Sequence, residues 1–217
     1  MTDHIHLILQ GLRPLYPDTR TPLLHADAFQ LLIATILSAQ TTDIQVNRVT
    51  PDLFRRFPDA SSLSRAPVEE VAAIIQSVGL HHGKARNVCA CAVQLLERFD
   101  DQVPSSIEEL ASLPGVGRKT ANVVAGQYFG LPAVFVDTHV GRVARRLGLT
   151  SHSDPVKVER ELRAILADGI KTEFASLLFL HGGAVCHARR PPECAGCPLN
   201  DFCPSSEASL TNPETGR

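Results

Sequence analysis

The chain has 217 residues, of which 44% are hydrophobic and 20% are charged, and its formal net charge is −2 at pH 7. This length allows one domain or two small ones with a real hydrophobic core, and the charge excludes a globally basic nucleic-acid-binding protein. A DNA-binding surface would have to be a local patch. No segment has the length of a transmembrane helix and no charged-then-apolar signal peptide opens the chain, so a cytoplasmic location is expected.

Nearly every segment has the apolar periodicity of a helix, which predicts an all-α fold of roughly ten helices. Asp27 precedes a strongly apolar segment as a helix cap, and Pro67 stands at the first-turn position of another. In the first half of the chain we predict helices at residues 3–13, 28–38, 43–57, 67–77 and 84–99.

A glycine-rich turn joins two apolar helical segments in the middle of the chain. The first segment begins at a capping box formed by Ser106 and Glu109, and the second runs from Thr120 to about Phe129. Between them, Pro114-Gly115-Val116-Gly117 allows a tight turn whose backbone can come close to a ligand. The N–H groups that open the second helix would then form an anion-binding site.

Lys119 lies in the first turn of that second helix. Only four of the 21 basic side chains are lysines, and the others are arginines. A lysine in a chain that otherwise uses arginine suggests a chemistry that arginine does not supply, since only lysine readily becomes a neutral amine. The turn alone fits equally well an ordinary helix-turn-helix corner with an exposed lysine.

Downstream of the turn we predict one short strand and three further helices. The strand is residues 133–136, and the helices cover residues 137–147, 154–167 and 172–186. Asp137 opens the first of these helices, and taken alone it is predicted to be a helix cap. A domain boundary is expected near residue 130, and residues 205–217 have the composition of a disordered tail.

The six cysteines form two groups. Four of them lie close together near the end of the chain, with seven, two and five residues between them: Cys186, Cys194, Cys197 and Cys203. In a cytosolic chain this group indicates a metal site rather than disulfides. Thiolates bind zinc or an iron–sulfur cluster, and zinc is the less favoured because paired Cys-x-x-Cys knuckles are absent. Cys89 and Cys91 face different directions on a helix and are predicted to be buried apolar residues.

Residues 113–121, Leu-Pro-Gly-Val-Gly-Arg-Lys-Thr-Ala, resemble the helix–hairpin–helix of DNA glycosylases. Residues 136–140, Val-Asp-Thr-His-Val, follow at the family's usual separation. Together with the terminal cysteines and the shorter segments Leu37–Gln40 and Val78–Leu80, they make the chain resemble bacterial endonuclease III from about residue 5 to 204.

The resemblance implies a two-lobed helix–hairpin–helix glycosylase fold. A helical barrel lobe would span residues 20–130 and carry the hairpin at about 107–128. A second lobe would combine residues 1–19 with 131–204. This lobe would hold a [4Fe–4S] cluster through Cys186, Cys194, Cys197 and Cys203. The family typically has six residues between the first two cysteines, so the seven here lengthen a basic loop.

The resemblance also implies the activity. A protein of this family removes oxidised pyrimidines from double-stranded DNA and nicks the abasic site by β-elimination through a lysine Schiff base. Lys119 would be the nucleophile and Asp137 would stabilise positive charge on the sugar and assist proton transfer. A monomer associated with the nucleoid is expected.

The DNA contacts follow from the same resemblance. Gln40 would fill the space left by a flipped base, and Leu80 would wedge into the stack. From residue type alone, Leu80 could equally be a core residue and Gln40 a helix cap. The amides of Gly115 and Gly117 would contact phosphates. A local basic face would be formed by exposed lysines and arginines. The candidates are Lys84, Arg86, Arg142, Arg145, Arg146, Arg189 and Arg190, and the strongest are Arg189 and Arg190.

Lysine is a nucleophile only when its amine is neutral. Neutrality at pH 7 requires about 4–5 kcal/mol from the reference pKa of lysine. A helix N-terminus disfavours the ammonium by only about 0.3–1 kcal/mol. Desolvation by the bound nucleotide or a nearby base must therefore contribute to the activation of Lys119.

Two other functions remain open on the sequence. A monofunctional glycosylase of the same fold, such as an adenine-mismatch enzyme, uses water as nucleophile and generally lacks the hairpin lysine. A non-catalytic DNA-binding module with a metal staple would need neither Lys119 nor Asp137. Trapping of a covalent DNA adduct with borohydride separates the three functions.

Overall fold

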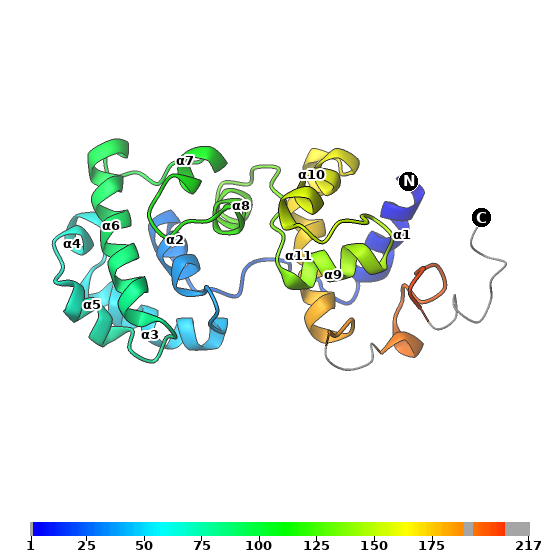
Figure 1. Cartoon of the computed structure of the whole chain (residues 1–217), viewed down its shortest axis with the longest axis horizontal. Coiled ribbons are helices and arrows are strands. Elements are labelled where there is room, and N and C mark those ends of the chain that lie inside the picture. Colours follow the sequence, from blue (N-terminus) through cyan, green and yellow to red (C-terminus); the bar gives the residue numbers. More distant parts are fainter. Residues whose placement is uncertain (1, 189–192, 207–217) are drawn as a thin grey trace. The chain divides into compact units, whose positions relative to one another are not determined.

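The structure, a computed structural model, describes residues 2–188 and 193–206 (Figure 1). Every regular element in these two ranges is a helix, which confirms the predicted all-α fold. The chain divides into two compact units, one formed by Thr21–Leu131 and the other by Met1–Arg20 with Pro132–Arg217.

The unit of residues 21–131 is built around α2, whose residues 31–37 are all buried. Helix α2 contacts α3, α6 and α8, while α6 packs against α4 and α5 (Figure 1). The apolar α2 segment predicted from the sequence is thus the core of this unit. Its helices are α2 (Ala28–Leu37), α3 (Asp43–Arg56), α4 (Ala60–Ser64), α5 (Val68–Ile74), α6 (His81–Phe99), α7 (Ile107–Ala111) and α8 (Arg118–Gln127).

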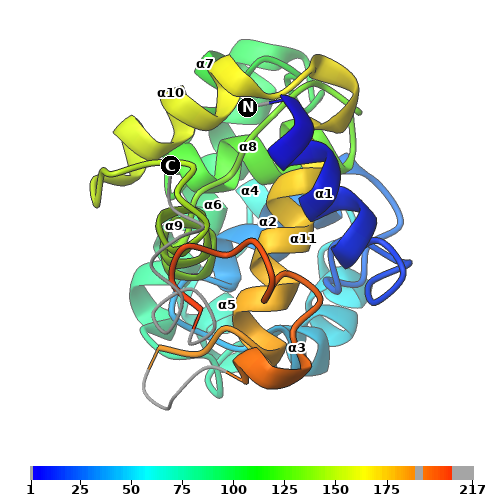
Figure 2. The ribbon, with the colours of Figure 1, turned by 90° about the vertical axis from the view of Figure 1, so that its right-hand side faces the viewer.

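The unit that contains the chain ends is built around α11. Figure 2 looks onto this unit and shows α11 between α1 and α9, both of which it contacts. Phe174, Leu177 and Leu178 of α11 are completely buried. The helices are α1 (Thr2–Leu12), α9 (Thr138–Arg146), α10 (Pro155–Ile165) and α11 (Lys171–Ala184), with 3₁₀ turns η1 (Asp168–Ile170) and η2 (Cys194–Gly196).

One helix was missed by the sequence analysis and one predicted element is wrong. Helix α4 was not predicted, because its five residues are too few for apolar periodicity; a capping box of Asp59 and Ser62 starts it. The predicted strand at residues 133–136 is a buried extended segment that pairs with no other strand in the described part of the chain. The Thr172 hydroxyl instead donates to the Ala133 carbonyl at 3.1 Å.

Candidate active site and cysteine-lined pocket

The hairpin turn between α7 and α8 depends on Gly115. Its φ of 77° lies in the left-handed region, and a Cβ there would stand 2.8 Å from Cβ of Asn87 and 3.1 Å from Cγ2 of Ile36. The Val116 N–H donates to the Leu113 carbonyl at 3.1 Å and closes the turn. The turn therefore packs tightly on neighbouring helices, which fixes the direction in which α8 leaves it.

We expect Gly115→Ala to lower the free energy of unfolding by about 1–3 kcal/mol, because both the backbone conformation and the space oppose a side chain. Gly117→Ala is the matched control. Gly117 has φ −87° and open space around its Cβ position, so the loss there should stay below about 1 kcal/mol. Urea unfolding of the two variants measures the difference, and equal losses would contradict the packing argument.

The start of α8 is open to a ligand. Gly117 is its N-cap and provides no side-chain hydrogen bond, so the first N–H groups of the helix are not capped from within it. This uncapped, dipole-positive start of α8 suits a phosphate group.

The start of α7, by contrast, is capped by a side chain. The Ser106 hydroxyl accepts from the Glu109 N–H and donates to the Glu109 carboxylate, so the predicted capping box is only half formed.

Lys119 lies in the first turn of α8 with an exposed side chain. Its charge acts on Asp43, the first residue of α3 in the same unit. Burial raises the pKa of Asp43, and the Lys119 ammonium opposes this by lowering it. The sequence analysis missed Asp43, because nothing in the local pattern relates the start of α3 to the hairpin.

Asp137 belongs to the other unit and is the N-cap of α9. Its Oδ1 accepts from the Val140 N–H at 2.8 Å, so the capping interpretation of this residue is confirmed. The half-buried carboxylate also lines a pocket together with Thr138, Gly141 and Arg145. Capping and a chemical role are compatible, since the cap occupies one carboxylate oxygen and fixes the rotamer of the side chain.

Gln40 and Leu80 share two unusual features. Both are exposed, and both have a left-handed backbone, with φ 55° and 60°. The Leu80 side chain is 69% exposed, so Leu80 is not a core residue. Thr42, rather than Gln40, is the side chain that caps α3. The two structural alternatives that the sequence left open therefore do not apply.

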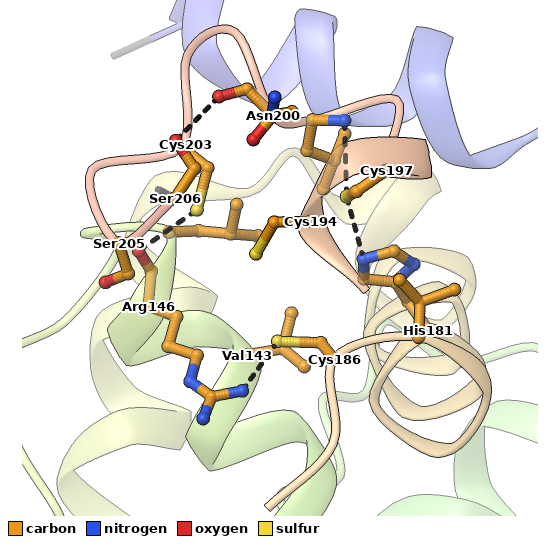
Figure 3. Close-up of a pocket in the computed structure, with 13 residues that line it drawn as sticks. Val143, Arg146, His181, Cys186, Cys194, Cys197, Asn200, Cys203, Ser205 and Ser206 are labelled. Atoms are coloured by element: carbon orange, nitrogen blue, oxygen red, sulfur yellow. Dashed lines mark hydrogen bonds between the residues drawn. The ribbon is translucent and has the colours of Figure 1, made fainter. Parts of the chain in front are cut away.

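The four clustered cysteines line one pocket, and Figure 3 shows their sulfur atoms around a common space. Cys186 follows the end of α11, while the other three come from η2 and the loop after it. Burial raises the pKa of Cys197, and the charges of Cys203, Cys194 and Cys186 raise it further. The four thiols are thus close enough to repel one another when ionised.

Two basic side chains adjoin this pocket. Nη1 of Arg146 donates to Sγ of Cys186 at 3.1 Å. His181 lies with Nε2 3.5 Å from Sγ of Cys197 and Nδ1 3.3 Å from the hydroxyl of Tyr16. Burial lowers the pKa of His181 to about 4, so its ring is neutral near pH 7.

The four thiols line one pocket, but they are not arranged around a single metal ion. Among the residues that the structure describes, no three His, Cys, Asp or Glu side chains are arranged to hold a single metal ion. Zinc ligated at about 2.3 Å would need its four sulfurs within roughly 4 Å of one another. Thiolates are also the ligands of iron–sulfur clusters, which do not require four sulfurs so close to one another.

One member of the predicted basic face, Lys84, is buried, so its assignment to that face is wrong, and two further members, Arg142 and Arg146, are only half-exposed. Lys84 is only 5% exposed. Arg142 donates to the carbonyls of Gly182 and Cys186, and Arg146 donates to Cys186 and to the His187 carbonyl. The two arginines thus satisfy partly buried acceptors while part of each side chain remains in solvent.

Other predicted residues have different outcomes. Arg86 and Arg145 are exposed, whereas Arg189 and Arg190 lie outside the described residues. Cys89 and Cys91 are buried, as predicted, and burial raises the pKa of Cys91 to about 12. No helix in the described ranges is long and apolar enough to cross a membrane.

Comparison with known proteins defines the class first. The profile of the HhH-GPD superfamily of base excision DNA repair proteins matches residues 33–168. The chain is 46% identical over 203 residues to endonuclease III of Synechocystis sp., covering 93% of this chain and 92% of that protein. It is 38% identical over 200 residues to endonuclease III of Escherichia coli, covering 92% and 94%. The chain therefore belongs to the endonuclease III family of this superfamily.

Solved structures agree with this assignment. A trapped endonuclease III–DNA covalent intermediate aligns with a TM-score of 0.90 and 37% identity, over 97% of this chain and 99% of that one. A thermostable thymine-DNA glycosylase aligns with a TM-score of 0.85 and 22% identity, over 95% and 98%, and shares the fold.

Proposed function

We propose that Lys119 and Asp137 carry out the reaction of a base excision repair enzyme that removes oxidised pyrimidines and nicks the resulting abasic site. The exposed amine of Lys119 at the open start of α8 carries this proposal. The family relationship supports it, since one relative has been trapped as a covalent intermediate with DNA. Lysine is the nucleophile that explains a covalent intermediate of this kind.

The reaction has two halves. The neutral amine of Lys119 attacks C1′ of the damaged nucleotide, the glycosidic bond breaks, and the base leaves with its electron pair and a proton. The amine nitrogen then expels O4′, which takes up a proton as the sugar ring opens, and the resulting Schiff base acidifies the 2′ position. Loss of a 2′ proton expels the 3′ phosphate, and water then releases the enzyme from the sugar. Asp137 stabilises the positive charge that develops on the sugar and assists these proton transfers.

Activation of Lys119 requires a group that accepts its proton, because the helix terminus alone does not make the amine neutral, and Asp43 is that group in the proposal. Its half-buried carboxylate interacts with the Lys119 ammonium, and burial raises its pKa. A carboxylate with a raised pKa is a better base than an exposed one. Asp43 is therefore the acceptor for the Lys119 proton once the bound nucleotide displaces water from both groups.

We expect Asp43→Asn to slow Schiff-base formation by about 10²-fold, the scale of a general base. Burial raises the pKa of Asp43, so this carboxylate should become protonated at a higher pH than an ordinary aspartate, whose pKa is about 4. The wild-type rate should therefore fall, as the pH is lowered, before the pH reaches about 4. The amide variant should lose this acid limb. Single-turnover rates against pH measure it.

Asp52→Asn is the matched control for this pH profile, since Asp52 is an exposed acid of the same helix, paired with Arg55. It should leave both the rate and the acid limb unchanged. An acid limb that persists in Asp43→Asn would show that another group accepts the proton.

The proposed DNA contacts divide into insertion and phosphate binding. Gln40 and Leu80 are exposed side chains on strained backbone, which suits insertion into the space of a flipped base. The hairpin amides of Gly115 and Gly117 suit phosphate oxygens, and Arg189 with Arg190 would add charge. Phosphate contacts of this kind bind any sequence, as repair of scattered lesions requires.

We assign the cysteine pocket to a [4Fe–4S] cluster held by Cys186, Cys194, Cys197 and Cys203. Four mutually close thiols need a positive centre to remain ionised together. The cluster would supply a cross-link between the end of α11 and the final loop. Arg146 would stabilise the Cys186 thiolate by its hydrogen bond.

The test of the proposed function is a borohydride trap. The protein is incubated with duplex that contains thymine glycol or an abasic site. A covalent adduct and a nicked strand support the bifunctional enzyme. Base release without an adduct would support a monofunctional glycosylase, and binding alone a non-catalytic module. A cytoplasmic, nucleoid-associated location is part of the proposal, and fluorescence microscopy of a tagged chain tests it.

A further inference from the structure

The turn that carries Gln40 is held by two local hydrogen bonds. The Thr41 N–H donates to the Ser38 carbonyl at 3.0 Å, which closes the turn. The Thr41 hydroxyl donates to the Ala39 carbonyl at 3.4 Å, so its lone pairs remain to accept. Both Gln40 and Leu80 have a backbone conformation that costs a non-glycine residue on the order of 1–3 kcal/mol. Conformations of this kind persist only where surrounding contacts hold them.

Lys84 is hydrogen-bonded to both of these turns. Its Nζ donates to Oγ1 of Thr41 at 2.8 Å, and its backbone N–H donates to the Leu80 carbonyl at 3.0 Å. The two turns lie next to each other, since a Cβ added to Gly79 would stand 3.9 Å from both the Gln40 carbonyl oxygen and Thr41 Oγ1. A further hydrogen bond of 2.5 Å joins Gln45 to Ser77 at the more exposed side.

The side chain of Lys84 is an unusual choice for a buried position. It is only 5% exposed, stands in the first turn of α6, and forms no ion pair with any residue in the described ranges. A helix N-terminus disfavours a cation, and burial lowers the pKa of Lys84. Folding alone would favour an apolar side chain here, which points to a selected role for the ammonium.

We propose that Lys84 is a positioning residue for base extrusion, which fastens the Gln40 turn to the Leu80 turn so that both side chains enter the duplex as one preformed wedge. This inference rests on the insertion role proposed above for Gln40 and Leu80. A preformed wedge needs no ordering of its two turns when the stack opens, so the binding energy is used to extrude the base.

The test uses Lys84→Met, which keeps the volume and removes the hydrogen bond. We expect its thermal unfolding temperature to match or exceed that of the wild type, because a desolvated ammonium is lost. We expect kcat/KM on thymine-glycol duplex to fall about tenfold or more. The fluorescence rise of 2-aminopurine placed opposite an abasic analogue should slow in parallel. Borohydride trapping on single-stranded abasic DNA should change less than about twofold, since no stack is opened.

Two further variants sharpen the result. Thr41→Val removes the acceptor from a partly exposed position, should act in the same direction, and should add little in the double variant with Lys84→Met. Lys171→Met is the matched control. Lys171 is a lysine with 9% exposure that pairs with Asp168 in the other unit, and its loss should spare the 2-aminopurine signal.

Wild-type extrusion rates in Lys84→Met would overturn the proposal, and so would an equal loss on single-stranded and duplex DNA. Failure of the proposed function is a separate outcome. If the wild-type protein forms no adduct with abasic DNA, the chemistry assigned to Lys119 fails. If Leu80→Ala leaves the 2-aminopurine signal unchanged, the insertion role fails.

Discussion

Lys119→Gln is expected to abolish the covalent adduct with abasic DNA and to lower strand nicking by about 10³-fold or more, the scale on which enzymes lose a nucleophile. Glutamine keeps much of the length and polarity of the side chain but has no amine that forms a Schiff base. Because Lys119 is exposed in the first turn of α8, the substitution should change the free energy of unfolding by no more than about 0.5 kcal/mol. Loss of activity then reports on chemistry and not on folding.

Lys157→Gln is the matched control for this experiment. Lys157 is another exposed lysine near the start of a helix, α10, and its loss should leave the adduct intact. DNA binding by Lys119→Gln should weaken only slightly, since one exposed charge is removed among several phosphate contacts. A borohydride adduct that persists in Lys119→Gln would assign the nucleophile to another amine and remove the basis of the proposed mechanism.

The hairpin could be predicted because its signals are local. Proline and glycine define a turn, and apolar periodicity defines the helices on either side. The apolar segment that predicted the second helix began at Thr120, whereas α8 begins at Arg118, within the usual uncertainty of a helix end. The spacing of the four cysteines was equally local, and the structure brings them to one pocket.

Asp43 and Lys84 could not be predicted, because their roles come from tertiary contacts. A charged residue in the first turn of a helix is typical of a solvated surface, and Lys84 was assigned to one. It is buried because the turn of Thr41 lies over it. Asp43 follows the N-cap of α3 and has the sequence context of any first-turn acid. Only the packing of α2 against both α3 and α8 relates it to Lys119.

The left-handed backbone of Gln40 and Leu80 could not be predicted from the sequence. Glycine normally occupies such positions, so Gln40 and Leu80 carry no local mark of positive φ. The αL conformation turns Leu80 out of the unit just before α6 begins, and it leaves 69% of the side chain in solvent. Strain and apolar exposure together mark a functional residue more clearly than either feature does alone.

Cys197→Ala is expected to remove the visible absorbance of the purified protein and its bound iron and sulfide, which should otherwise approach about four of each per chain. Without the cluster, the pocket would retain three thiols and the final loop would lose its cross-link to the end of α11. Because a bound cluster would contribute directly to folding, the unit of α11 should then unfold at a lower temperature and become sensitive to protease.

The chain offers its own control for this change. Cys89→Ala is the same substitution at a buried cysteine, whose exposure is 7%. Cys89 lies on α6 and does not line the pocket. Its loss should cost about 1 kcal/mol of packing and leave colour and iron unchanged. Elemental analysis and absorption spectra distinguish the two variants. Stoichiometric zinc in place of iron in the wild-type protein would contradict the cluster assignment.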